Sequence, residues 1–97
     1  MIKLEFEDFD WDAANKLKIL KRFEIQIVEE FFKQELFIIS DKQHSQIEER
    51  FISVGEGPRN KPMFVCFTIR NGKIRVIFAR FMKAKEAMKY EEFKKSI

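Results

Sequence analysis

MFVCFTIRNGKIRVIFARF, residues 63–81, is the stretch of sequence that decides the fold. Asn71 and Gly72 separate two apolar runs, Met63–Ile69 and Ile74–Phe81. An Asn-Gly pair between such runs is the strongest short-range signal of a β-hairpin, because both central residues of the favoured turn need a positive φ. The stretch therefore predicts two long antiparallel strands joined by a two-residue turn.

The segments on either side of this hairpin predict an α+β domain. Upstream we expect first a strand at Leu4–Phe6 and then a helix that Asp10 or Asp12 caps and that runs to about Phe23. A second helix with the apolar stripe Val28, Phe31 and Phe32 follows, and after it a buried strand at Leu36–Ile39. A loop at Ser40–Glu49 then leads to a strand at Arg50–Val54, which is broken by Gly55–Pro58. Downstream, a closing helix presents Ala84, Ala87, Met88 and Phe93 on one face. The order predicts a small single domain over residues 1–97, with a twisted, largely antiparallel sheet, two N-terminal helices and one C-terminal helix.

Length and composition place the chain among folded single domains. Its 97 residues are enough for one hydrophobic core but not two, and an apolar content of 45% argues against a disordered chain. The single cysteine, Cys66, excludes an intrachain disulfide and is interpreted as a small buried residue. The N-terminus lacks the layout of a signal peptide, and no apolar run reaches membrane-spanning length. We therefore expect a cytoplasmic protein that is not associated with a membrane.

The net charge of +3 conceals a strong asymmetry. Residues 1–58 carry 8 Lys and Arg against 13 Asp and Glu, a net of −5, and residues 59–97 carry 11 against 3, a net of +8. Such polarity indicates an acidic partner for the C-terminal half, most often nucleic acid. The alternative is that strand and helix edges simply carry solvated lysines.

Several motifs along the chain resemble the BrnT toxin family. They are Phe9-Asp10-Trp11-Asp12 with Asn15, Glu49-Arg50-Phe51-Ile52-Ser53-Val54-Gly55, Phe64-Val65-Cys66-Phe67-Thr68-Ile69-Arg70, and Ile74-Arg75-Val76-Ile77-Phe78-Ala79-Arg80 followed by Glu86 and Tyr90. The resemblance extends from Leu4 to Phe93, and it implies a RelE-like ribonuclease fold and a toxin of a type II toxin–antitoxin pair that cleaves RNA without a metal. It also implies a BrnA-like antitoxin with a ribbon-helix-helix part, through which the complex would contact operator DNA.

The sequence departs from the family pattern at three places. Arg22-Phe23-Glu24 stands where many members have Lys-His-Gly, Phe78 where a serine is common, and Met82-Lys83 where small and hydroxyl residues are usual. Loss of the histidine weakens the expectation of cleavage if that histidine takes part in it. Two functions therefore remain open: a metal-independent ribonuclease toxin, or a catalytically weakened module that acts as an antitoxin-binding co-repressor or binds RNA. A purely structural interaction domain would leave the charge asymmetry unexplained.

Three arginines are candidates for a phosphate site. Metal-free RNA cleavage needs a base for the 2′-OH, cations for the pentacovalent phosphorane and an acid for the leaving oxygen, and the planar fork of arginine suits the second role. Arg80, which matches the family's Ala-Arg, comes first, followed by Arg50 and Arg75. Strict strand alternation puts residues 74, 76, 78 and 80 on one face and Arg75 on the other, so Arg75 and Arg80 would share a site only through a bulge or a strong twist. Each arginine is alternatively the ion-pair partner of a glutamate, such as Glu49 for Arg50.

Two further candidates lie on the closing helix. Glu86 and Tyr90 are one helical turn apart and therefore on one side of it. Glu86 is a candidate base or a partner that orients an arginine, and Tyr90 is a candidate for stacking on a base or donating a proton. An ion pair with Arg80 and a packed tyrosine are the structural alternatives. The residues expected to contact the RNA backbone are Arg75, Lys83, Lys85 and Lys89.

His44, the one histidine of the chain, lies in the polar stretch before Arg50. Histidine is the side chain whose ordinary pKa lies nearest neutrality, so His44 is a candidate catalytic residue, although an incidental surface histidine would look the same. Trp11 is interpreted as a core anchor, and Asp12 with Asn15 as a helix cap. No cluster has the spacing of metal ligands and no glycine-rich phosphate loop is present, so neither a metal nor a cofactor is expected.

Overall fold

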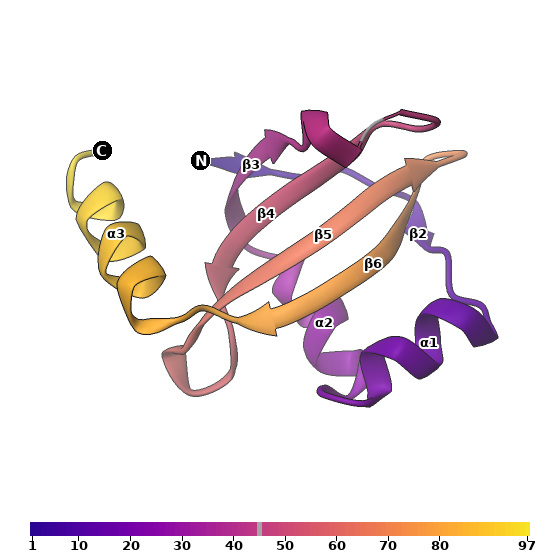
Figure 1. The fold of residues 1–97 in the computed structure, drawn as a ribbon, viewed down its shortest axis with the longest axis horizontal. Helices are drawn as coiled ribbons and strands as arrows, with labels where there is room; N and C mark the ends of the chain where they lie inside the picture. Colours follow the sequence, from indigo (N-terminus) through magenta and orange to yellow (C-terminus); the bar gives the residue numbers. More distant parts are fainter. Residues whose placement is uncertain (45) are drawn as a thin grey trace.

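The computed structural model describes residues 1–44 and 46–97. A twisted six-stranded sheet carries two helices on one face and a third helix at one end of the other face (Figure 1). Its strands are β1 (Ile2–Lys3), β2 (Asp8–Phe9), β3 (Glu35–Ser40), β4 (Arg50–Glu56), β5 (Pro62–Arg70) and β6 (Lys73–Phe81), in the spatial order β1-β3-β4-β5-β6-β2. The helices are α1 (Ala13–Leu20), α2 (Ile25–Phe31) and α3 (Ala84–Lys95), and within the described residues none is long and apolar enough to span a membrane. The α+β prediction is confirmed, because the neighbouring strands pair antiparallel except for β2 with β6.

The β5–β6 hairpin forms where the Asn-Gly pair predicts it. Asn71 and Gly72 have φ angles of 53° and 76°, so both lie in the left-handed region that the turn requires. The register pairs Arg70 with Lys73 next to the turn. This pairing fixes which side chains of β5 and β6 lie opposite one another.

The predicted strand at Leu4–Phe6 is wrong. The N-terminal residues form two shorter strands instead: β1 pairs with β3 at one edge of the sheet, and β2 pairs in parallel with β6 at the other. The residues between them must cross the width of the sheet, so their backbone runs across the strands rather than alongside one. The apolar alternation of Leu4 and Phe6 reflects packing, because both side chains lie against the core.

The helix α1 begins at the cap that the sequence predicts. The Asp12 carboxylate accepts the backbone N–H of Asn15 at 3.1 Å, and the Asn15 side chain accepts the N–H of Asp12 at 2.8 Å. The helix ends at Leu20, before the predicted end near Phe23, because the chain turns there and Phe23 packs edge-on against Phe81, with 5.1 Å between ring centres. The predicted stripe of α2 is confirmed, since Val28, Phe31 and Phe32 are all buried.

Two predictions about β3 and β4 need correction. The strand at Leu36–Ile39 is present, but it is buried on one side only, with Leu36 fully buried and Ile39 63% exposed. Gly55 lies inside β4 instead of breaking it, and β4 continues to Glu56. A Cβ atom at Gly55 would lie 2.5 Å from Leu36 Cδ2, so the absence of a side chain at Gly55 leaves room for the buried Leu36 side chain. A short 3₁₀ turn, η2 (Pro58–Asn60), then leads into β5.

The two faces of the sheet differ in what covers them. On the core face, α1 and α2 pack against side chains that are at most 1% exposed, among them Met63, Val65, Phe67, Ile74 and Val76. We call the opposite side the open face. Its central residues are Arg50, Ile52 and Val54 of β4, Phe64, Cys66 and Thr68 of β5, and Arg75, Phe78 and Arg80 of β6. In Figure 1 the strands lie in front of α2, and the open face is turned toward the viewer.

A β-bulge in β6 overturns the predicted side-chain alternation. The pairing with β5 shifts by one residue in mid-strand, which makes Ile77 an extra residue. Residues 74 and 76 lie on the core face, but beyond the bulge it is the buried Ala79 that takes this face. Phe78 and Arg80 therefore share the open face with Arg75. One strand thus presents both arginines on the same side, which strict alternation excludes.

The helix α3 covers one end of the open face. Tyr90 is buried and contacts Phe37, with 5.9 Å between ring centres, and Phe93 contacts the same ring at 4.7 Å. The predicted apolar face is wrong in part, because Ala84 and Met88 are exposed. Ion pairs as well as apolar packing hold the helix, so the side turned toward the sheet consists of Glu86, Tyr90, Phe93 and Lys94.

The described residues between β3 and β4, 41–44 and 46–49, form a loop, as predicted, whereas Ser40 belongs to β3 and Ser45 lies outside the described residues. The loop contains one short 3₁₀ turn, η1 (Lys42–His44). The His44 side chain contacts Asp41, the residue before this turn, with 2.9 Å between His44 Nδ1 and Asp41 Oδ2. The turn brings the imidazole to the end of the open face at which β4 begins.

Candidate functional site

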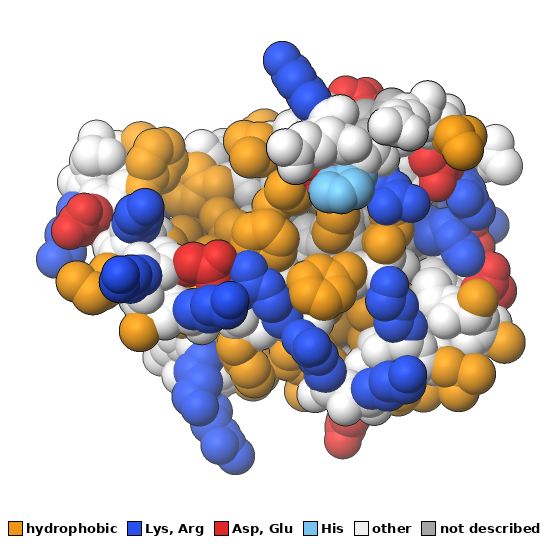
Figure 2. Space-filling model, viewed as in Figure 1, with side chains coloured by type: hydrophobic (Ala, Val, Ile, Leu, Met, Phe, Trp, Pro, Cys, Tyr) orange, Lys and Arg blue, Asp and Glu red, His pale blue; other side chains and the backbone are white. Residues whose placement is uncertain are grey.

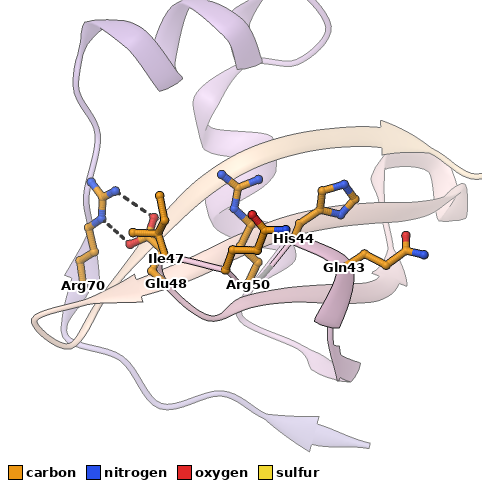
Figure 3. Close-up of a pocket in the computed structure, with 7 residues that line it drawn as sticks. Gln43, His44, Ile47, Glu48, Arg50 and Arg70 are labelled. Atoms are coloured by element: carbon orange, nitrogen blue, oxygen red, sulfur yellow. Dashed lines mark hydrogen bonds and ion pairs between the residues drawn. The ribbon is translucent and has the colours of Figure 1, made fainter.

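His44 and Arg50 line one pocket at the edge of the open face. This pocket, which we call the His44 pocket, has a volume of about 440 Å³ and is lined by Gln43, His44, Gln46, Ile47, Glu48, Arg50 and Arg70. In Figure 3 the Arg50 side chain lies between His44 on one side and the Arg70–Glu48 pair on the other. The pocket therefore combines a titratable imidazole with two guanidinium groups.

Polar contacts orient the side chains of the His44 pocket. When His44 donates from Nδ1 to Asp41, its Nε2 is the nitrogen left for a substrate. Arg70 donates to both oxygens of Glu48, from Nε at 3.0 Å and from Nη2 at 2.9 Å. This hydrogen bond lowers the pKa of the Glu48 carboxyl and raises the pKa of Arg70, so both groups stay charged.

A second pocket continues from the first toward α1. It has a volume of about 280 Å³, shares Glu48, Arg50 and Arg70 with the His44 pocket, and is otherwise lined by Ala14, Asn15, Lys18, Arg75, Val76 and Ile77. We call the two pockets together the arginine groove. Its cationic residues are Lys18, Arg50, Arg70 and Arg75. A groove of this composition favours an anionic ligand that is longer than one phosphate.

Arg75 is held by the start of α1. Its Nη2 lies 2.9 Å from Asp12 Oδ2 and its Nη1 lies 3.6 Å from Asp10 Oδ1, and its side chain is 15% exposed. The backbone N–H of Asn15 lowers the pKa of the Asp12 carboxyl, and Arg75 adds to this effect. The sequence predicts an RNA contact for Arg75; in the structure its first contacts tie α1 to β6.

Arg80 and Glu86 lie at the opposite end of the open face. Arg80 donates from Nη1 and Nη2 to the two Glu86 oxygens at 2.7 and 2.9 Å, and its guanidinium carbon lies 4.6 Å from the centre of the Phe64 ring. The backbone N–H of Lys83 also donates to Glu86, at 2.8 Å. The Arg80 fork lowers the pKa of Glu86 to about 2, and Glu86 raises the pKa of Arg80. Glu86 is therefore suited to orient Arg80 and is a poor proton acceptor at neutral pH.

Tyr90 is a packing residue. It is 5% exposed, contacts Phe37, and has Lys94 Nζ 5.0 Å from its ring centre. Burial raises the pKa of its phenol, and Glu56 adds to the effect. Of the two interpretations that the sequence allows, a packed tyrosine describes this position.

The five candidate catalytic residues divide between two places. One end of the open face holds His44 and Arg50, and the other holds Arg80, Glu86 and Tyr90. The two ends of the open face are separated by four residues along β4, from Arg50 to Val54, which corresponds to about 13 Å. A single phosphate does not reach both ends, but a short stretch of RNA does.

The positive charge of the C-terminal half gathers around the open face. The three lysines predicted to contact RNA are exposed: Lys83 and Lys85 at the start of α3 and Lys89 in its middle. Figure 2 shows Lys and Arg side chains around an apolar area on the side of the molecule seen in Figure 1. Lys and Arg side chains thus surround the apolar surface of the open face. We call this set the cationic rim; it consists of the cationic residues of the arginine groove together with Arg80, Lys83, Lys85 and Lys89.

Neither a metal cluster nor an activated thiol is found in the described part of the chain. Among residues 1–44 and 46–97, no group of three or more His, Cys, Asp and Glu side chains is placed to hold a metal ion. Cys66 is half-buried on the open face rather than inside the core, which corrects its interpretation as a buried residue. Burial raises the pKa of its thiol, which disfavours the reactive thiolate.

The sequence analysis missed three charged residues of the arginine groove as site candidates: Lys18, Glu48 and Arg70. Arg70 and Glu48 are 22 residues apart, and they meet because the β4–β5 register places Arg50 opposite Thr68. Arg70 then lies just beyond this pair, beside the residues that precede β4. A predicted β4–β5 register would have found this contact, whereas Lys18 needs the position of α1.

A single α+β domain with an arginine-lined groove and a cationic rim on its sheet is typical of proteins that bind nucleic acid. Comparison with protein families is more specific. The chain belongs to the family of BrnT, the ribonuclease toxin of type II toxin–antitoxin systems, whose model matches residues 11–86. This match confirms the resemblance seen in the motifs, and it implies an antitoxin as a partner. Comparisons with curated proteins and with solved structures gave no match.

Proposed function

We propose that the chain is an endoribonuclease toxin that needs no metal ion and that its catalytic centre is the His44 pocket. The observation that carries this proposal is the presence of His44 and Arg50 in one pocket at the edge of the open face. Together they supply a proton-transfer group and a phosphate-binding group, as cleavage of a phosphodiester requires.

The reaction in this pocket would be attack by the neighbouring 2′-OH. His44 takes the 2′-OH proton on Nε2 while the 2′-oxygen bonds to phosphorus. Arg50 binds the non-bridging oxygens and stabilises the charge of the phosphorane. The bond from phosphorus to the 5′-oxygen then breaks to leave a 2′,3′-cyclic phosphate, the 5′-oxygen takes a proton from water on the opposite side of phosphorus, and the imidazolium later releases its proton to solvent. Asp41, which contacts Nδ1, stabilises the imidazolium between these two steps.

The other candidate residues bind RNA in this proposal. Glu86, with a pKa of about 2, orients Arg80 for a phosphate oxygen rather than accepting a proton. The backbone contacts are assigned to Arg75, Arg80, Lys83, Lys85 and Lys89. Tyr90 supports α3 and takes no part in proton transfer.

We also propose that a BrnA-like antitoxin with a ribbon-helix-helix part neutralises the chain in the cytoplasm. The family implies a partner of the antitoxin class. In this proposal the complex contacts operator DNA through the antitoxin alone, because the partner covers the cationic rim of the toxin.

A second function is favoured by Phe23. Many members carry a histidine at this place, whereas Phe23 is 7% exposed and packs against Phe81. If cleavage depends on a group at this position, the chain is a weakened module that binds RNA or acts as an antitoxin-binding co-repressor.

Incubation of the purified, antitoxin-free chain with total RNA in EDTA tests both functions. We expect the wild type to produce fragments. His44→Ala and Arg50→Ala should each lower the cleavage rate by a factor of about 100 or more. Lys42→Ala is the matched control, because Lys42 lies in the same turn as His44 but does not line the pocket. Cleavage by His44→Ala at the wild-type rate would remove the chemistry from this pocket. Intact RNA that the wild type nevertheless binds would contradict cleavage of free RNA and favour the weakened module.

A further inference from the structure

We infer that the chain binds its RNA as a single strand and that Phe78 is a platform on which one base stacks. The inference rests on the proposed function, because it assumes RNA as the ligand. It goes beyond that function by naming the form of the RNA and the residue that contacts a base. It does not depend on where or whether the RNA is cut.

Phe78 lies in the central row of the open face. The register places it opposite Cys66, which lies opposite Ile52, and all three side chains are half-buried. The row on one side consists of Arg50, Thr68 and Arg75, and the row on the other consists of Val54, Phe64 and Arg80. The apolar row is therefore flanked by arginines on both sides.

Guanidinium groups already lie against the aromatic rings of this face. The Arg22 guanidinium carbon is 5.6 Å from the centre of the Phe78 ring, and that of Arg80 is 4.6 Å from the centre of the Phe64 ring. Aromatic rings and arginine planes are the two kinds of side-chain surface on which unstacked bases pack. Because Arg22 lies over the Phe78 ring, a base would stack on the ring by displacing this guanidinium, which would then be free to pack against the base.

The spacing of the arginines suits a backbone that passes over this row. Arg75 and Arg80 pair with residues four apart on β5, so they are separated by about 13 Å along the strands. An extended dinucleotide covers such a span. Phosphates on either side of the stacked base would reach the arginine groove at one end and Arg80 at the other.

The apolar row distinguishes a single strand from a duplex. Paired RNA hides the faces of its bases and presents mainly phosphates and 2′-hydroxyls, which a cationic rim alone would bind. A partly exposed phenylalanine between the two rows that carry the arginines gains contact only from a base that is free to unstack. An acidic protein segment would also suit this charge pattern, but it would pack against any apolar side chain and would not need an aromatic ring at residue 78.

Fluorescence anisotropy with a labelled 2′-O-methyl oligouridylate tests the inference. This probe keeps the bases and phosphates but lacks the free 2′-OH, so binding is measured without cleavage. The comparison probe is the same strand paired with its complement. The variants are Phe78→Tyr, which keeps the ring face, and Phe78→Leu, which keeps apolar bulk without it. Leu17→Ala, on α1 and 65% exposed, is the control for loss of an exposed apolar side chain elsewhere, and thermal unfolding verifies that each variant is folded.

We expect the single strand to bind more tightly than the duplex. Phe78→Leu should weaken single-strand binding about fivefold or more, and Phe78→Tyr should bind like the wild type. The dependence of affinity on salt should not change in Phe78→Leu, because stacking releases no counterions, whereas Arg80→Ala should reduce the slope by about 0.7.

Equal binding of single strand and duplex, or Phe78→Leu binding as well as Phe78→Tyr, would overturn the inference. Failure of the proposed function looks different. A wild type that binds the methylated single strand as expected, yet leaves unmodified RNA intact, would refute cleavage and support the inference. Cleavage of RNA by the wild type, together with unchanged binding by Phe78→Leu, would support the proposed function and refute the inference about Phe78.

Discussion

Arg80 at the end of β6 and Glu86 in the first turn of α3 are joined by two hydrogen bonds, of 2.7 and 2.9 Å, between the guanidinium fork and the carboxylate. Both side chains are partly exposed, at 22% and 37%. The pair connects the helix to the sheet and holds the guanidinium over the Phe64 ring. An arginine at the end of the open face is thus oriented before any ligand arrives, which lowers the entropy lost on binding.

Substitution of Arg80 should affect RNA binding more than chemistry. Arg80→Ala removes one phosphate contact, and Arg80→Lys keeps the charge without the fork. Because the proposed chemistry lies in the His44 pocket, we expect both variants to raise KM, Arg80→Ala more strongly, with kcat close to that of the wild type. Steady-state cleavage of a defined RNA measures the two constants. A lower kcat with unchanged KM would place Arg80 in the reaction itself.

Glu86 should make stability depend on pH in the acid range. Its pKa is about 2 in the folded chain, against an ordinary value of 4.5. Since the folded value is the lower one, the ion pair stabilises the fold fully above pH 4.5, and this contribution is lost as the pH falls from 4.5 through 2. Solvent screening keeps the effect small, because the carboxylate is partly exposed. Thermal unfolding across this range should show a flatter pH dependence for Glu86→Gln than for the control Glu92→Gln, which lies exposed on the same helix; parallel curves would contradict the prediction.

The two roles of Asp12 can be separated by substitution. Asp12→Asn keeps an N-cap for α1 but loses the charge that pairs with Arg75, whereas Asp12→Ala loses both. We expect Asp12→Ala to lower the free energy of unfolding by about 1 kcal/mol more than Asp12→Asn, since asparagine caps a helix about as well as aspartate. Urea denaturation measures the difference. Equal losses would show that the ion pair, not the cap, carries the effect.

The close approach at Gly55 predicts a cost for any side chain there. In Gly55→Ala the new Cβ would meet Leu36 Cδ2 at 2.5 Å, so we expect a loss of about 1–3 kcal/mol from overpacking. Leu36→Ala removes the clashing atom but leaves a cavity of its own. In a double-mutant cycle the combined variant should therefore be more stable than the sum of the two single losses predicts, and strict additivity would argue against the clash.

Tyr90 offers a test of packing against chemistry. Tyr90→Phe keeps the ring that contacts Phe37 and should cleave RNA at the wild-type rate. Tyr90→Ala should lower the free energy of unfolding by about 3 kcal/mol, because it empties a buried site under α3. Chemical denaturation and the EDTA cleavage assay on the same preparations measure both effects. A large loss of activity in a fully folded Tyr90→Phe would return the hydroxyl to the reaction.

Local signals predicted some elements well and failed at others for identifiable reasons. The Asn71-Gly72 turn and the Asp12 cap were predicted correctly, because each depends on residues that are neighbours in the chain. The strand predicted from the alternation at Leu4–Phe6 is absent, because alternation indicates which side chains are buried but not whether the backbone pairs with a neighbouring strand. The prediction of which side of α3 faces the sheet failed, because ion pairs to β4 and β6, and not only apolar contacts, orient the helix.

The candidate site was predictable as a set of residues but not as an arrangement. Arg50, Arg80 and His44 follow from their chemistry and from the family motifs. Their division between two ends of the open face depends on the β4–β5 register, which involves residues far apart in the sequence. The pairing of Arg70 with Glu48 depends on the same register and has no local signal.

The sequence by itself determined the hairpin, the cap of α1, the charge asymmetry and the family, because these depend on short-range conformational preferences and on residue identity. Only the tertiary structure decided that a bulge at Ile77 brings Arg75, Phe78 and Arg80 to one face, and that His44 and Arg50 share a pocket away from Arg80. The physical reason is that register and bulges are set by the packing of the whole sheet against α1 and α2. That packing energy is a sum over contacts between distant residues, and no short window of sequence contains it.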